Sequence, residues 1–114
     1  MAPSDDRPWG RITVIDNGDG FQVKRLEVRP GRRLSLQVHR RRSEHWYVVH
    51  GVATATVGPA EVDLPAGNSI DIAVGERHRL ANHGDTDVVI VEVGRGDYLG
   101  EDDIERFDDD FGRV

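Results

Sequence analysis

Two polar runs within an otherwise β-rich chain carry residue types that can bind a metal ion. In the first, LSLQVHRRRSEHWYVVHG (34–51), a strand period of two places Gln37 and His39 on one face. Glu44 follows at the start of the next apolar run. Burying imidazole and carboxylate groups together is costly unless they pair or bind something. The run is therefore either a metal site or an unusually charged surface.

A second imidazole has to come from another part of the chain. The run GERHRLAN (75–82) offers His78 at the head of a predicted strand. Two imidazoles, a carboxylate and an amide oxygen make a mixed nitrogen and oxygen set that suits Zn, Mn, Fe, Co or Ni. We therefore predict a divalent metal ion, zinc in the first place, on Gln37, His39, Glu44 and His78.

Length and composition set the class of protein. The 114 residues suffice for one domain with a single core. There is no cysteine, so neither a disulfide framework nor a thiolate metal site is available. The start, MAPSDDRPWG, does not have the pattern of a signal peptide, and no apolar stretch is long enough to span a bilayer. We expect a cytoplasmic protein with no membrane partner.

The net charge of −6 is unevenly distributed along the chain. Residues 24–42 hold eight basic residues and one acid, whereas the tail EDDIERFDDD (101–110) holds seven acids and one arginine. A basic patch on an acidic protein favours a small anionic ligand over nucleic acid, because the rest of the surface would repel a polyanion. We expect no nucleic-acid partner.

Turn signals separate many short runs that have the composition of strands. NGDG (17–20), RPGR (29–32), PAGN (65–68) and NHGD (82–85) are examples of the turns, and FQVKRLEV (21–28) and VATATV (52–57) of the runs. Many short strands at even spacing predict an all-β sandwich or barrel. Only residues 101–111 have helical potential. We expect order through about residue 104 and fraying beyond it.

Two glycine-framed motifs resemble those of the cupin family. The pattern G-x5-Q-x-H-x4-E-x6-G over residues 31–51 is similar to the first cupin motif, with glutamine in the first ligand position. The pattern G-x5-A-x-G-x2-H-x3-N over residues 67–82 is similar to the second, with alanine where proline is usual. The resemblance implies a double-stranded β-helix, a small jelly-roll barrel with the metal inside, as a single domain over residues 1–114.

Further segments resemble the type II mannose-6-phosphate isomerase domain, a cupin usually found behind a mannose-1-phosphate guanylyltransferase domain. They cover nearly the whole chain and are RPWG (7–10), VKR (23–25), PGRRLSLQVH (30–39), RSEHWYVVHG (42–51), GERHRLAN (75–82), VEV (91–93) and DYLGEDDIERFDDDFGR (97–113). The chain departs from the family at Arg40 and Arg41, where relatives are rich in histidine. The sequence holds no guanylyltransferase domain, so we expect a stand-alone domain.

This resemblance implies an enzyme that interconverts mannose 6-phosphate and fructose 6-phosphate and feeds GDP-mannose and polysaccharide biosynthesis. The metal would polarise the sugar carbonyl as a Lewis acid. Cations in the family-like segments would hold the phosphate, and the candidates are Lys24, Arg42 and Arg79.

Three residues are candidates for the base that moves the carbon-bound proton. Glu44 could leave the metal or share it, and Glu92 is an acid in an otherwise apolar strand. His45 has a suitable intrinsic pKa, but strict alternation turns it away from the Glu44 face.

A second class of function stays open beside the isomerase. The chain could be a non-catalytic cupin that binds a sugar phosphate or sugar nucleotide and partners a separate guanylyltransferase. The ligand set favours the isomerase, whereas the isolated domain leaves room for the alternative.

The other face of the first polar run bears on assembly. If Gln37 and His39 point into the barrel, then Leu34, Leu36 and Val38 point outward. So large an apolar stripe should be covered. A homodimer is the natural cover, and the alternative is the chain's own N-terminal strand.

Overall fold

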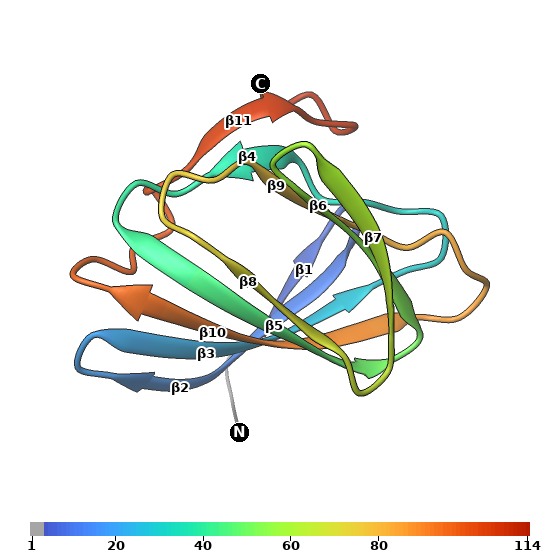
Figure 1. Ribbon diagram of the computed structural model, residues 1–114, viewed down its shortest axis with the longest axis horizontal. Helices are drawn as coiled ribbons and strands as arrows, with labels where there is room; N and C mark the ends of the chain where they lie inside the picture. Colours follow the sequence, from blue (N-terminus) through green and yellow to red (C-terminus); the bar gives the residue numbers. More distant parts are fainter. Residues whose placement is uncertain (1–3) are drawn as a thin grey trace.

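The computed structural model describes residues 4–114, which form an all-β barrel of two facing sheets (Figure 1). One sheet has the order β1-β2-β3-β10-β5-β8 and the other the order β11-β4-β9-β6-β7. All paired strands are antiparallel. The strands are β1 (Ser4–Arg7), β2 (Gly10–Gly18), β3 (Phe21–Val28), β4 (Leu36–Val38), β5 (Arg42–His50), β6 (Val52–Val57), β7 (Ala60–Pro65), β8 (Ser69–Ile72), β9 (His78–Ala81), β10 (Val88–Gly96) and β11 (Glu105–Asp108). The all-β prediction is confirmed.

The core lies between the two sheets and follows the period of two on the central strands. On β10 the buried row contains Val88, Ile90 and Glu92, and on β5 it contains Trp46 and Val48. Because alternate residues face the core, the same rows that bury apolar side chains carry acidic ones into the barrel. The apolar core is completed by residues of both sheets, among them Trp9, Leu26, Val28, Ala53, Ala55, Ile72 and Leu80.

The expectation of an outward apolar stripe on residues 34–38 is wrong. Leu34 belongs to the core, and Val38 is also buried, with only Leu36 half-exposed. Strict alternation fails because the regular strand β4 begins only at Leu36, so the backbone before it turns Leu34 inward. The stripe therefore offers no surface for a dimer.

The acidic tail is neither helical nor frayed after residue 104. Residues 105–108 form strand β11, which pairs with β4 at the top of Figure 1. The tail also pairs with the basic run: Arg33 bonds Asp110 at 2.8 Å, and Arg40 bonds Glu105 at 3.0 Å. Much of the basic run is thus neutralised within the chain, and it no longer argues by itself for an anionic ligand.

Among residues 4–114 there is no helix with the length and hydropathy required to cross a membrane.

Candidate metal centre

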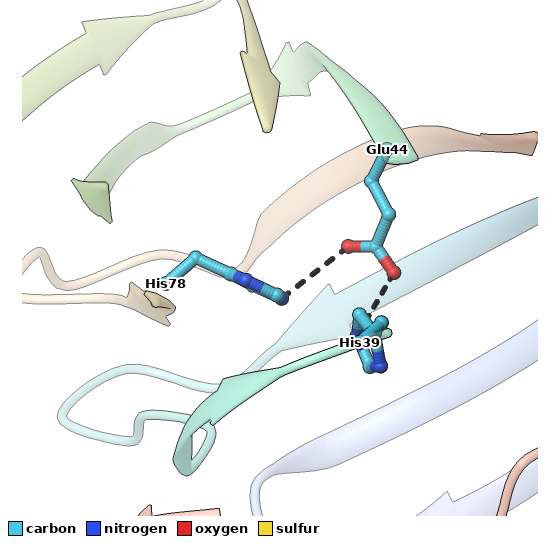
Figure 2. A group of neighbouring side chains, drawn as sticks. All are labelled: His39, Glu44 and His78. Atoms are coloured by element: carbon cyan, nitrogen blue, oxygen red, sulfur yellow. Dashed lines mark ion pairs between the residues drawn. The ribbon is translucent and has the colours of Figure 1, made fainter. Parts of the chain in front are cut away.

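Three predicted ligands meet inside the barrel. One ligand atom from each of His39, Glu44 and His78 lies within 4.8 Å of the others, and all three side chains are buried. His39 Nε2 lies 3.1 Å from Glu44 Oε2, and His78 Nε2 lies 3.6 Å from Glu44 Oε1. Figure 2 shows both imidazoles directed at the same carboxylate. The two motifs, far apart in sequence, thus supply one site.

The ligands come from opposite sheets. On β5 the buried alternate positions are Arg42, Glu44 and Trp46, which sends the Glu44 carboxylate inward. His39 directly follows β4, and His78 is the first residue of β9. Each imidazole therefore stands at a strand end, facing the carboxylate across the barrel.

Both imidazoles are held by backbone carbonyls, which fixes their tautomers. His39 Nδ1 lies 2.7 Å from the carbonyl oxygen of Asp103, and His78 Nδ1 lies 2.9 Å from that of Glu76. A carbonyl only accepts, so each Nδ1 carries the hydrogen. When the imidazole is neutral, as a metal ligand has to be, its Nε2 presents a lone pair toward Glu44, and when it is protonated, Nε2 donates to Glu44. Such second bonds are a regular feature of histidine ligands to metals.

The environment of the His78 Nε2 atom indicates whether the site fits a cation. It is buried and has no hydrogen-bond partner among residues 4–114. A buried lone pair beside a carboxylate is unfavourable unless a proton or a metal ion lies between them. Burial lowers the pKa of His78, despite the opposing effect of Glu44, and so favours the neutral form that binds metals. The residues fit a divalent metal ion.

Glu44 is ionised in spite of its burial. Burial alone would raise its pKa, but the hydrogen bond and charge of His39, with His78 and Arg42, lower the pKa well below its ordinary value. Arg42 Nε donates to Glu44 Oε2 at 3.0 Å. An ionised carboxylate is the form that a metal ligand requires.

Gln37 stands next to this cluster. It lines the barrel cavity and lies opposite His78 in the β4–β9 register. Its amide oxygen has a weak contact of 3.5 Å with the Ser35 hydroxyl. The amide is thus available near the cluster, and its role as fourth ligand stays a prediction.

A second buried carboxylate, Glu92, faces the same cavity. In the register of the sheet it lies between Lys24 on β3 and Trp46 on β5. Trp46 Nε1 donates to Glu92 Oε1 at 3.2 Å and to Glu44 Oε1 at 3.1 Å. Burial and the charge of Glu44 raise the pKa of Glu92 to about 8. The two neighbouring acids are therefore held in different protonation states.

The three cations predicted to bind phosphate have different surroundings. Lys24 and Arg42 line the cavity, but Arg79 does not. Arg79 donates to the carbonyls of Leu34 and Asp108, and pairs with the Asp108 carboxylate at 2.9 Å. Its guanidinium thus ties β9 to β11 and to the segment that precedes β4.

His45 lies outside the barrel, as alternation predicts. Its side chain is 44% exposed, and Nδ1 pairs with Asp71 at 2.5 Å on the outer face of the sheet. His45 therefore is not brought together with Glu44 and Glu92 in the cavity.

Sequence reasoning did not identify several residues that the structure adds to the site. Trp46 bridges the two carboxylates, Asp103 supports His39, and Glu101 pairs with Lys24 at 2.8 Å. Arg106, on β11, lines the cavity as well. The family-like run YLGEDDI was the available signal for the acidic pair, but its position over the metal ligands follows only from the fold.

Comparison with known proteins identifies relatives of the chain. The family model described as mannose-6-phosphate isomerase C-terminal matches residues 4–109. Over 108 residues, the chain is 50% identical to the xanthan biosynthesis protein XanB of Xanthomonas campestris and to the alginate biosynthesis protein AlgA of Pseudomonas aeruginosa. It is 46% identical over 108 residues to the mannose-1-phosphate guanylyltransferase ManC of Salmonella typhimurium. Each match covers 95% of this chain but only 22–23% of the relative.

Solved structures confirm the double-stranded β-helix. The capsular polysaccharide assembling protein CapF of Staphylococcus aureus superposes with a TM-score of 0.83 at 22% identity, over 95% of this chain and 34% of that one. A double-stranded β-helix protein of Klebsiella pneumoniae superposes with a TM-score of 0.73 at 22% identity, over 82% of this chain and 80% of that one. At this identity the likeness concerns the fold alone.

Proposed function

Because the chain belongs to the mannose-6-phosphate isomerase C-terminal family, we propose that it is a metal-dependent isomerase that interconverts mannose 6-phosphate and fructose 6-phosphate. One observation carries the proposal. The cluster His39, Glu44 and His78 shares a buried site with a second carboxylate, Glu92, whose protonation state differs. A metal site beside a separate proton-transfer group is what an aldose–ketose isomerisation needs.

His39, Glu44 and His78, with Gln37 as the fourth ligand, would hold the divalent metal. Zinc is the first candidate because it is commonly bound by histidine and carboxylate, and Mn, Fe, Co and Ni suit the same donor set. When bound, the metal supplies Lewis-acid polarisation of the sugar carbonyl.

Glu92 is the proposed proton carrier. The reaction moves one hydrogen from C2 to C1 of the sugar and one from the 2-hydroxyl to the carbonyl oxygen. Trp46 fixes Oε1 of Glu92, which leaves the other oxygen of the ionised form to take the carbon-bound proton and return it. With a pKa of about 8, that form is a minor but accessible fraction near neutral pH. Burial keeps water from competing for that proton. His45 is not proposed for this role, since it faces outward.

The names of the relatives suggest the setting of the reaction. They include xanthan and alginate biosynthesis proteins and mannose-1-phosphate guanylyltransferases, of which this chain spans less than a quarter. We propose that the product feeds GDP-mannose and polysaccharide biosynthesis in the cytoplasm and that a guanylyltransferase is the partner. Assembly as a homodimer also stays a proposal, and it needs a surface other than residues 34–38.

Proton exchange in heavy water tests the proposed chemistry. Metal-loaded protein is incubated with mannose 6-phosphate in D₂O, and NMR follows both the C2 proton signal and the appearance of fructose 6-phosphate. We expect turnover by the wild type and a rate at least about a hundredfold lower for Glu92→Gln with unchanged metal content. His45→Gln is the control and should keep its rate. Binding of mannose 6-phosphate without exchange or product would favour the non-catalytic alternative.

A further inference from the structure

Among the residues that the structure describes, Arg106 is a cation of the cavity wall that forms no ion pair. Four other cations of the wall each have a carboxylate within 3.5 Å, in the pairs Arg7–Asp5, Lys24–Glu101, Arg42–Glu44 and Arg113–Asp109. Arg106 makes no side-chain hydrogen bond or ion pair with any of residues 4–114, and its Nε is buried without a partner. Burying part of an unpaired guanidinium costs free energy unless a bound anion accepts its hydrogen bonds.

The surroundings of Arg106 increase that cost. Burial and the charge of Arg113 lower its pKa from the ordinary value and Arg7 acts in the same direction, while the charges of Asp109 and Glu101 only partly offset them. An anion bound here would relieve both the desolvation and the repulsion between like charges. Arg106 is thus the cation of the wall that is most in need of an external anion.

The position of Arg106 suits the phosphate end of the proposed substrate. In the register of the sheet Arg106 lies opposite Gln37, which lies opposite His78. Neighbouring strands are about 4.8 Å apart, so the backbone of Arg106 lies roughly 10 Å from that of His78. A hexose whose carbonyl end meets the metal ligands places its C6 phosphate at a distance of this order.

The second cation, Lys24, is reached only past Glu101. The Lys24 side chain is 4% exposed, and its ammonium bonds the Glu101 carboxylate, which comes from the turn between Gly100 and Asp103. With this turn in place the cavity offers about 60 Å³ to the centres of water molecules. That space holds a few waters. A phosphate that reaches the Lys24 ammonium has to displace the Glu101 carboxylate from it.

We propose that the substrate phosphate binds between Arg106 and Lys24, and that the Glu101 carboxylate occupies this anion site until the phosphate displaces it. The proposal rests on the sugar-phosphate isomerase function and deepens it. A phosphate dianion matches the two cations better than the single carboxylate of Glu101 does, because its oxygens can accept charge-assisted hydrogen bonds from both. Glu101 then acts as an internal competitor that keeps the cavity closed when no phosphate is present.

Calorimetric titration of the metal-loaded protein tests both the phosphate site on Arg106 and Lys24 and the competition by Glu101. The probes are mannose 6-phosphate, mannose and inorganic phosphate. Arg106→Gln should lower the affinity for mannose 6-phosphate about tenfold or more without changing that for mannose, and Arg106→Lys should recover part of the loss. Glu101→Gln should raise the affinity for mannose 6-phosphate and inorganic phosphate severalfold. Arg40→Gln and Asp102→Asn, both exposed and outside the cavity wall, are the matched controls.

Hydrogen exchange in the absence of ligand gives a readout independent of the substrate. The amides of residues 100–104 should exchange faster in Glu101→Gln than in the wild type, and unchanged exchange would refute the closing role. Equal phosphate affinity of Arg106→Gln and Arg40→Gln would overturn the anion site. Weaker binding by Glu101→Gln would show that Glu101 contacts the sugar instead of competing with it. If the wild type does not prefer mannose 6-phosphate to mannose, the isomerase proposal fails, and the inorganic phosphate titrations still decide whether Arg106 binds an anion.

Discussion

The imidazole of His39 donates from Nδ1 to the backbone carbonyl of Asp103 at 2.7 Å, across 64 residues of sequence. The same Asp103 accepts, through its carboxylate, the backbone N–H groups of Arg40 at 2.9 Å and Arg41 at 3.0 Å. Burial would raise its pKa, but these two N–H groups outweigh that effect and lower the pKa, so the carboxylate is ionised. The C-terminal segment is thus fastened beside a metal ligand and supports its orientation.

Loosening this support should weaken metal binding without removing a ligand. Asp103→Ala keeps the backbone carbonyl that accepts from His39 but removes the carboxylate that anchors it. We expect metal affinity to fall about tenfold because the ligand histidine is then held less firmly. Competition with a chelator measures the affinity. Asp102→Ala removes the neighbouring charge, whose carboxylate bonds only Tyr98 among the side chains of residues 4–114, and should bind metal like the wild type. Equal affinities of the two variants would contradict the supporting role.

Removal of either imidazole should abolish tight metal binding. We expect His39→Ala and His78→Ala to retain less than about a tenth of the wild-type metal content after dialysis, because one lost ligand greatly weakens a mixed site. Elemental analysis gives the content, and circular dichroism checks that the barrel is folded. His45→Ala removes an exposed imidazole and should keep full metal content. Wild-type content in either of the first two variants would place the metal elsewhere.

The raised pKa of Glu92 should make the stability of the metal-free protein depend on pH. Folded Glu92 has a pKa of about 8, whereas the unfolded chain has the ordinary value of 4.5. As pH rises between these values, the unfolded chain releases the proton and the folded chain keeps it, so this group destabilises the fold increasingly. Glu92→Gln lacks this effect.

The free energy of unfolding of Glu92→Gln, relative to the wild type, should therefore rise from pH 4.5 to pH 8. We expect a gain of at least about 1.4 kcal/mol, because a tenfold difference in proton affinity between the folded and unfolded chains has that free energy. Urea unfolding in the presence of a chelator measures it. A difference between the two proteins that does not change with pH would show that Glu92 is ionised in the fold.

The sequence was a good guide wherever strand alternation was regular. On β5 the period of two correctly turned Glu44 inward and His45 outward, and the two glycine-framed motifs led to His39 and His78. These inferences depend only on local geometry and on motifs that specify a fold. The double-stranded β-helix was predictable for the same reason.

Alternation failed where the backbone was irregular or where distant segments meet. Leu34 precedes the regular strand, so its burial could not be read from the period. Arg79 stands in a family-like motif, but its partner Asp108 lies in the tail. The acidic tail resembled a solvated end because its partners are basic residues far away in the sequence, and only the fold brings them together.

Turnover measured as a function of added metal is the most direct test of the proposed isomerase. The protein is stripped of metal, and conversion of mannose 6-phosphate to fructose 6-phosphate is followed in a coupled assay while zinc or another divalent ion is added. We expect no turnover without metal, a rise that saturates near one ion per chain, and no recovery in His78→Ala at the same metal concentrations. Full activity of the stripped wild type, or no activity of a fully loaded protein that binds mannose 6-phosphate, would contradict the proposal.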